Sequence, residues 1–292
     1  MKVKNLLDDN APKKVLKSEI ASRKPLNIKE GQKQLPIEVY SPWANIIIKF
    51  KIPDEIFSEL EKMYDYTINN FKSFGDQLVG QIEEEPEVTM EILEKFPMWG
   101  GFCMDAVRNY ATTQNTITLA AEKDKLNAFL KEKLLTKINT MWFVRQKPGE
   151  YNPSHIHTNC KVSAIAYVRT PKQQVKSRKN HYESDGKVTF MNNTGTDINF
   201  ASAQCSFEPV PGDMYVFGAH QHHMVWPYRS ADPDDKRVSL SFNADITTQT
   251  DLQTMHKREK EMVKHYIDNN LIDNSEVKDD KGVTASDINK SG

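Results

Sequence analysis

Two kinds of hydrophobic periodicity divide the chain near its middle. In the first half, apolar side chains recur at helical spacing, beginning with the run 54–72 just after Pro53. Further helices are predicted over 103–113 and about 121–138. The last of these repeats an apolar residue every four positions, at Leu126, Leu130, Leu134 and Ile138. Such stripes are typical of helices that pack one face against a core.

After Met141 the pattern changes to short alternating or wholly apolar runs separated by glycine, proline, asparagine and aspartate, which is typical of β-strands. We expect seven or eight strands. Seven of them can be bounded as 140–146, 161–169, 187–191, 204–209, 214–217, 223–226 and 236–243. In the last of these, apolar residues alternate with Arg237, Ser239 and Ser241, which predicts one face on a core and one face toward a polar interior.

The patterned part of the chain has the size of one domain, which we expect over 37–246, with helices in 54–138 and strands in 139–246. Residues 1–36 are rich in charged residues and asparagine, and we expect them to be flexible. Residues 247–292 are predicted to form a charged helix near 250–269 and a disordered tail.

A long, insertion-like loop is predicted over 171–186. It contains a basic run, which is either solvated or a grip for an anionic substrate. The run consists of Lys172, Lys176, Arg178 and Lys179.

Composition indicates which partners and which cellular compartment to expect. The formal net charge is −1, from 39 basic and 40 acidic residues, so no general attraction to nucleic acid or membranes is expected. No apolar run reaches the about 18 residues that span a bilayer, and none of signal-peptide length follows the basic start. The three cysteines show no C-x-x-C spacing, which favours a reducing compartment. We therefore expect a cytoplasmic protein.

Three histidines and an arginine carry the candidate chemistry. Side chains two residues apart on a β-strand point to the same face, so His155 and His157 would project together and chelate one metal ion. His223, on a second strand, would add a third ligand and leave coordination positions open for substrates. Arg237 and Ser239 share a strand face and suit a carboxylate that needs an ion pair and a hydroxyl hydrogen bond.

Five segments, taken in order, resemble iron(II)- and 2-oxoglutarate-dependent oxygenases, most closely those found in tailed phages of marine bacteria. They are WFVRQKPGEYNPSHIH, VSAIAYVRTP, PVPGDMYVF, HMVWP and RVSLSFN. The family pattern is H-x-D or H-x-H, an SxxYV-like strand, P-G-D, H-x-V-x-P and R-x-S-x-S-F-N. The resemblance covers roughly residues 138–245.

The resemblance implies an α+β, mainly β fold: a double-stranded β-helix, or jelly-roll, barrel with N-terminal helices packed on one side. It implies a dioxygenase, a hydroxylase similar to prolyl 4-hydroxylases, that uses Fe(II), 2-oxoglutarate and O2, with ascorbate as a further candidate. The metal ligands would be His155, His157 and His223, because the H-x-V-x-P spacing favours His223 over its neighbours His220 and His222. The 2-oxoglutarate ligands would be Arg237 and Ser239, with Tyr167 as either a further hydroxyl donor or a core residue.

His157 is the main departure from the family, most members of which carry Asp or Glu there to offset the charge of the iron. Glu183 or Asp185 could supply a carboxylate instead. A cupin-like three-histidine enzyme that does not use 2-oxoglutarate is the alternative, although Lys161 and Val162 stand where the cupin pattern has glutamate. A non-catalytic phage scaffold or binding protein is a third reading. The substrate stays open among a peptide side chain, a nucleotide and a small metabolite, and the sequence does not reveal the oligomeric state.

Overall fold

The computed structural model describes residues 45–69, 73–175, 184–192 and 203–269. The strands in this part of the chain are β1 (Ile47–Lys51), β2 (Leu134–Gln146), β3 (Asn152–His155), β4 (Val162–Arg169), β5 (Val188–Met191), β6 (Gln204–Phe207), β7 (Asp213–Gly218), β8 (His223–Val225) and β9 (Arg237–Thr248). The helices are α2 (Asp54–Asn69), α3 (Met90–Leu93), α4 (Pro97–Thr118), α5 (Lys123–Phe129) and α6 (Gln249–Asp268), with a 3-10 turn, η1, at Gly75–Gln77.

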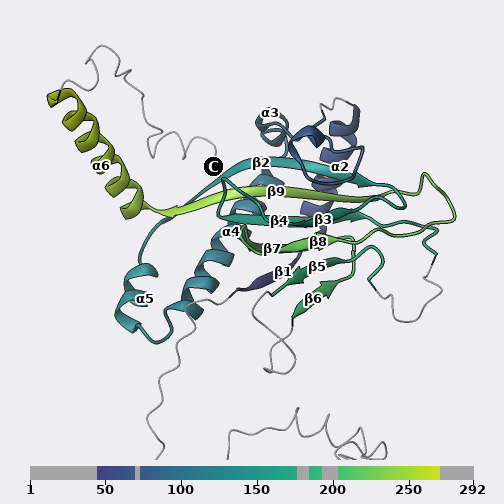
Figure 1. Ribbon diagram of the computed structural model, residues 1–292, viewed down its shortest axis with the longest axis horizontal. Helices are drawn as coiled ribbons and strands as arrows, with labels where there is room; N and C mark the ends of the chain where they lie inside the picture. The colour runs from purple at the N-terminus through teal and green to yellow at the C-terminus, as the bar shows by residue number, and fades with distance from the viewer. Residues whose placement is uncertain (1–44, 70–72, 176–183, 193–202, 270–292) are drawn as a thin grey trace, which may run out of the picture. The chain divides into compact units, whose positions relative to one another are not determined.

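Two sheets organise these strands (Figure 1). The larger has five strands in the order β1-β7-β4-β9-β2, and the smaller has four in the order β3-β8-β5-β6. All the pairings between these strands are antiparallel. Two antiparallel sheets with a few helices fit a jelly-roll-like α+β fold, in agreement with the expected fold class.

Strand β9 separates the hydrophobic core from the polar interior. Its residues Val238, Leu240 and Phe242 are at most 3% exposed and belong to the core that the sheet shares with α2 and α4. From the helices, this core receives Leu60, Met63, Trp99, Cys103 and Val107. The alternate residues of β9 face a pocket between the sheets. The helices thus pack on one face of the larger sheet, as expected, and the strict alternation of the sequence decides which residues reach the pocket.

The helix predicted over 121–138 is wrong in its second half. Helix α5 ends at Phe129, and Leu134 begins strand β2. A four-residue repeat is also a multiple of the two-residue period of a strand, so Leu134 and Ile138 fit both patterns. Pairing with β9 along its whole length decides for the strand, which moves the start of the strand region from 139 to 134.

Two strands were absent from the predicted set. Strand β1 lies at the edge of the larger sheet beside β7, where Lys49 and Lys51 both form ion pairs with the buried Asp213. Strand β3 ends at His155 and pairs with β8. Strand β2 begins at Leu134 rather than 140, and β9 ends at Thr248 rather than 243. The other predicted strands are found within a few residues of their expected bounds, as are the helices at 54–72 and near 250–269.

A segment without a strand label lengthens the larger sheet beyond β2. The amide of Val88 donates to Met141 O at 2.8 Å, Phe143 N donates to Pro86 O at 2.8 Å, and Arg145 N donates to Glu84 O at 2.9 Å. This ladder covers the outer edge of β2, so that the edge does not present unpaired backbone groups. It also brings the intervening Glu85 to a fully buried position.

Several predictions concern residues outside the described ranges: the flexible 1–36, most of the basic run in the loop 171–186, and the tail beyond 269. Among the described residues, no helix combines the length and the apolar character that crossing a membrane requires.

Candidate metal centre

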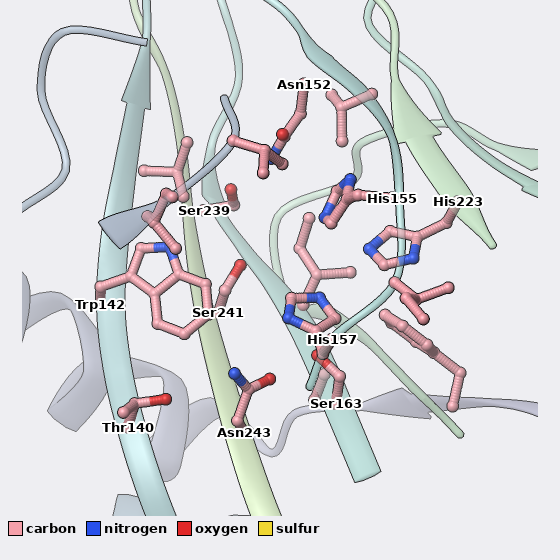
Figure 2. Close-up of a pocket in the computed structure, with 18 of the residues that line it drawn as sticks. Thr140, Trp142, Asn152, His155, His157, Ser163, His223, Ser239, Ser241 and Asn243 are labelled. Carbon is pink, nitrogen blue, oxygen red and sulfur yellow. The ribbon is translucent and has the colours of Figure 1, made fainter. Parts of the chain in front are cut away.

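His155, His157 and His223 converge at one point between the two sheets (Figure 2). One ring nitrogen of each lies within 4.8 Å of those of the other two. The ring centroids are 4.2 Å apart for His155 and His223, 5.2 Å for His155 and His157, and 5.1 Å for His157 and His223. Three imidazole nitrogens at this separation can surround a single metal ion.

Strand pairing positions two of the three rings. His155 ends β3 and is the register partner of His223, the first residue of β8. On its other side, His223 is paired with Phe190 of β5. The smaller sheet therefore fixes both residues side by side, with their rings on the face that looks toward β9.

His157 does not lie on a strand, which corrects the expectation that His155 and His157 share one. Strand β3 ends at His155 because its partner β8 begins at His223, leaving no strand for residues 156 and 157 to pair with. Instead, the His157 amide donates to Ala219 O at 2.9 Å, just beyond the end of β7. This backbone bond holds the loop so that the His157 ring still faces the other two.

The hydrogen bonds of two rings decide which nitrogen can bind a metal. His155 Nδ1 lies 2.7 Å from Pro153 O, and His223 Nδ1 lies 2.9 Å from Gln221 O. A carbonyl oxygen only accepts, so each Nδ1 carries the proton and each neutral ring has its lone pair on Nε2. Such a bond from the second nitrogen to a carbonyl is the usual way in which proteins orient metal-binding histidines.

Burial also keeps the three rings neutral. It lowers the pKa of His157 to about 4, with a smaller contribution from His155. Burial, followed by the neighbouring His155, lowers the pKa of His223 to about 3. The pKa of His155 is lowered as well, again mainly by burial. At neutral pH all three therefore offer lone pairs rather than positive charges.

The competing ligands lie elsewhere. His222 is exposed, and Nε2 of His220 lies 3.1 Å from Asn45 Oδ1. Asp185 lies 3.4 Å from Nη2 of Arg229 and is not part of the histidine group. Glu183 falls outside the described residues. Within the described chain, the group thus contains three imidazoles and no carboxylate.

A cavity of about 530 Å³ adjoins the histidines. Every second residue of β9 from its start lines this cavity: Arg237, Ser239, Ser241, Asn243 and Asp245. Trp142 of β2 lines it as well and packs on Phe74. One strand thus presents a continuous row of polar side chains past the metal centre.

Arg237 is buried at one end of this row with only 1% of its surface exposed. Its Nη1 donates to Gly186 O at 2.7 Å, and its guanidinium lies over the Tyr167 ring at 5.7 Å. No carboxylate pairs with it in the described residues. Arg237 Nε, Ser239 Oγ and the Tyr167 hydroxyl are all buried without a hydrogen-bond partner in that part of the chain.

Buried polar groups without partners are costly, and a buried cation without a counter-ion is more so. Three such groups together fit a binding site for an anionic ligand with several acceptor oxygens, as a carboxylate has. The sequence pointed to Arg237 and Ser239 and named Tyr167 as a possible donor. Burial raises the pKa of Tyr167 well above its usual range, so its hydroxyl stays protonated and can donate.

Tyr228 was missed by the sequence reasoning. Its hydroxyl donates to Gln146 O at 2.8 Å and accepts from Arg237 N at 3.1 Å, so it fixes the start of β9 against β2. Sequence alone gave no signal for this, because the tyrosine lies in a loop without periodicity. Asp245 was missed for another reason: the strand was expected to end at 243, whereas it continues to Thr248. Asn243 lies within the expected strand, on the face of Arg237 and Ser239, but was not singled out.

Several solved structures are similar in part. A 2OG-Fe(II) oxygenase family oxidoreductase from Burkholderia pseudomallei is 13% identical over 38% of this chain and 43% of its own length, with a TM-score of 0.28. A Pseudomonas putida prolyl-4-hydroxylase is 15% identical over 68% of this chain and 91% of its own, with a TM-score of 0.38. A Trichoplax adhaerens prolyl hydroxylase, in complex with a hypoxia inducible factor peptide, is 11% identical over 69% and 83%, with a TM-score of 0.42. Scores below 0.5 add no argument about function.

No curated protein matches the chain significantly. The model of one sequence family matches residues 140–243, and that family is described as "Putative 2OG-Fe(II) oxygenase". The matched segment contains the three histidines, Arg237 and Ser239. The cupin-like and scaffold readings are therefore not favoured, and the match supports the 2OG-Fe(II) oxygenase superfamily for this segment.

Proposed function

We propose that the protein is an iron(II)- and 2-oxoglutarate-dependent dioxygenase, and specifically a hydroxylase, that couples the oxidative decarboxylation of 2-oxoglutarate to oxidation of a substrate C–H bond. One observation carries the proposal. Within the described chain, a buried guanidinium without a carboxylate partner lies with two hydroxyls that lack hydrogen-bond partners, at the end of a cavity that three convergent neutral histidines also line. A metal site that did not use an anionic co-substrate would have no need of this arginine.

The residues divide the work as follows. His155, His157 and His223 would hold the iron through their unprotonated ring nitrogens, with Pro153 O and Gln221 O keeping two of the rings in place. Arg237 and Ser239 would bind the distal carboxylate of 2-oxoglutarate, and the Tyr167 hydroxyl would donate a further hydrogen bond. When bound, iron(II) and 2-oxoglutarate together supply the activation of O2, with ascorbate as a candidate reductant.

The charge of the site supports a dianionic co-substrate. Three neutral imidazoles leave both positive charges of an iron(II) ion uncompensated, and Arg237 adds another at the end of the same cavity. A dicarboxylate would offset the charge at both places, one carboxylate at the metal and the other at the arginine. In relatives with Asp or Glu at the position of His157, that carboxylate would neutralise part of the charge of the iron.

The test is an anaerobic iron(II) titration of the metal-free protein with and without 2-oxoglutarate, following the weak visible charge-transfer band of a metal-chelated keto acid. We expect the band in the wild type and its loss in Arg237→Gln at 2-oxoglutarate concentrations that saturate the wild type. Arg108→Gln is the matched control, because Arg108 is on the outer surface of α4, where it pairs with Asp105.

Three other outcomes would count against the proposal. Iron binding without a band in the wild type would indicate a three-histidine enzyme of the cupin-like kind. An absence of iron binding would leave the fold as a scaffold. Loss of the band in both arginine variants would show that Arg237 has no special part in co-substrate binding.

A further inference from the structure

The cavity continues along β9 and β2, away from Arg237. In Figure 2 the three histidines line one side of the cavity, across from Ser239 and Ser241, while Thr140 and Asn243 lie at the end farthest from Asn152. The second end is built by β2 and β9, which run side by side with Thr140 paired to Asn243. Because Arg237 and Asn243 lie at different points along the polar row of β9, a co-substrate at Arg237 leaves this second end open to another molecule.

An irregularity in β2 gives this end its polar side chains. The pairing register with β9 shifts between Ile138 and Thr140, so one extra residue, Asn139, is inserted at this point. A regular strand would turn neighbouring side chains to opposite faces, but Asn139 and Thr140 both line the cavity. The bulge therefore lets two neighbouring polar side chains of β2, rather than one, reach the cavity.

The oxygens at this end lack donors. Asn139 Oδ1, Thr140 Oγ and Asn243 Oδ1 are buried without a hydrogen-bond partner in the described chain. The orientation of Asn139 is fixed, because its Nδ2 donates to Asn159 O at 3.1 Å and to Asp245 Oδ2 at 2.8 Å. Its Oδ1 is thus available only as an acceptor.

Asp245 adds a negative charge to the same end. In the part of the chain that the structure describes, its carboxylate makes no ion pair within 4.0 Å. Lys137 is its register partner on β2 and also lines the cavity, but that side chain is exposed and no contact joins the two charged groups. The cavity is therefore polarised, with a cation at the Arg237 end and a carboxylate surrounded by acceptors at the other.

We propose that the Asn139–Thr140–Asn243–Asp245 end of the cavity binds a cationic, N–H-rich group of the molecule to be oxidised, a guanidinium or an ammonium. A guanidinium offers five N–H donors in a plane and an ammonium offers three, and neither needs an acceptor in return. The carboxylate would also repel 2-oxoglutarate from this end and direct it toward Arg237. Calling the bound molecule the substrate rests on the proposed function, whereas the binding site itself does not.

The test measures binding rather than turnover. Full-length protein is titrated calorimetrically under argon, with and without iron(II), against N-acetyl-arginine amide, N-acetyl-lysine amide and N-acetyl-norleucine amide. We expect one of the two cationic probes to bind at least about tenfold more tightly than the norleucine probe, since a charge-assisted hydrogen bond is worth more than apolar contact alone in a polar site. The better of the two identifies the group.

Three variants locate the site. Asp245→Asn keeps an acceptor for Asn139 and removes the negative charge. It should lower the affinity for the cationic probe about tenfold or more. Asn243→Leu removes one acceptor and leaves the hydrogen bond between Asn139 and Asp245 in place. It should lower the affinity for the same probe by a smaller factor. Asp251→Asn, on the exposed side of α6, removes an equal charge outside the cavity and should leave the affinity unchanged.

Equal binding of all three probes would overturn the proposal. So would an Asp245→Asn variant that loses thermal stability but keeps its affinity, because Asp245 would then serve only to hold Asn139. The keto-acid band is recorded on the same samples, so that failure of the cation site can be distinguished from failure of the proposed oxygenase function. A band without cation binding rejects the substrate class alone, whereas cation binding without a band rejects the oxygenase and keeps the site.

Discussion

Glu85 should make the stability of the protein fall as the pH rises. Its side chain is fully buried beside β2, and neither carboxyl oxygen has a hydrogen-bond partner among the described residues. Burial, with a smaller contribution from the negative charge of Glu150, raises the pKa of Glu85 from 4.5 to about 7. The folded protein thus keeps a proton on this carboxyl that the unfolded chain has already released.

The sign and size of the effect follow from this difference. Between pH 4.5 and about 7 the folded state binds more protons than the unfolded state, so the free energy of unfolding falls with pH across this window and levels off above it. Each pH unit in the window is worth about 1.4 kcal/mol, so the group contributes a total loss of about 3 kcal/mol. In Glu85→Gln the side chain does not titrate and this loss should disappear.

The assay is urea unfolding of metal-free wild type and Glu85→Gln at about pH 5 and about pH 8. The variant should gain roughly 2 to 3 kcal/mol relative to the wild type between the two conditions. Titration of the buried histidines is common to both proteins and cancels in the difference. Glu94→Gln, at an exposed position, should follow the wild type at both pH values. A constant difference between Glu85→Gln and wild type at both pH values would refute the reasoning.

Two further predictions concern packing. Leu60→Ala should lower the free energy of unfolding by about 2–5 kcal/mol in urea unfolding, because Leu60 is fully buried between α2 and the sheet, yet iron affinity measured in the cold should not change. Gly218→Ala would bring a methyl group to 2.7 Å from His220 Cε1 and 3.0 Å from the Tyr110 hydroxyl, so its thermal unfolding temperature should fall, with partial recovery in a Tyr110→Phe background. A Leu60→Ala protein with wild-type stability, or a Gly218→Ala protein with an unchanged unfolding temperature, would contradict these accounts of the packing.

The polar row of β9 could be predicted from sequence because strand periodicity is local. Once the run RVSLSF is taken as a strand with a buried apolar face, Arg237 and Ser239 must share the opposite face. The convergence of His155 with His223 could only be proposed from their motifs, since it depends on the pairing of β3 with β8. That pairing joins segments far apart in the chain, and no local pattern encodes it.

Other features depend on the same kind of distant pairing. Leu134 and Ile138 were assigned to a helix because their spacing fits both periods, and only the partner strand β9 decides between them. The insertion of Asn139, which turns two neighbouring side chains into the cavity, has no glycine or proline to announce it. Glu85 lies in a stretch of three glutamates, and its burial follows from the ladder with β2 rather than from its residue type.

The alternation of β9 fixes the spacing of the side chains that line the cavity. Cavity residues on one strand face are spaced by about 6.7 Å, so Arg237 and Asn243 stand roughly 20 Å apart along it. The distance between the proposed anchor at Arg237 and the proposed contacts at Asn243 is thereby set by backbone geometry, not by flexible side chains. Such a protein could change its preferred substrate by exchanging side chains at positions 241, 243 and 245, whereas a single-residue deletion within β9 would exchange its two faces and place core residues in the cavity.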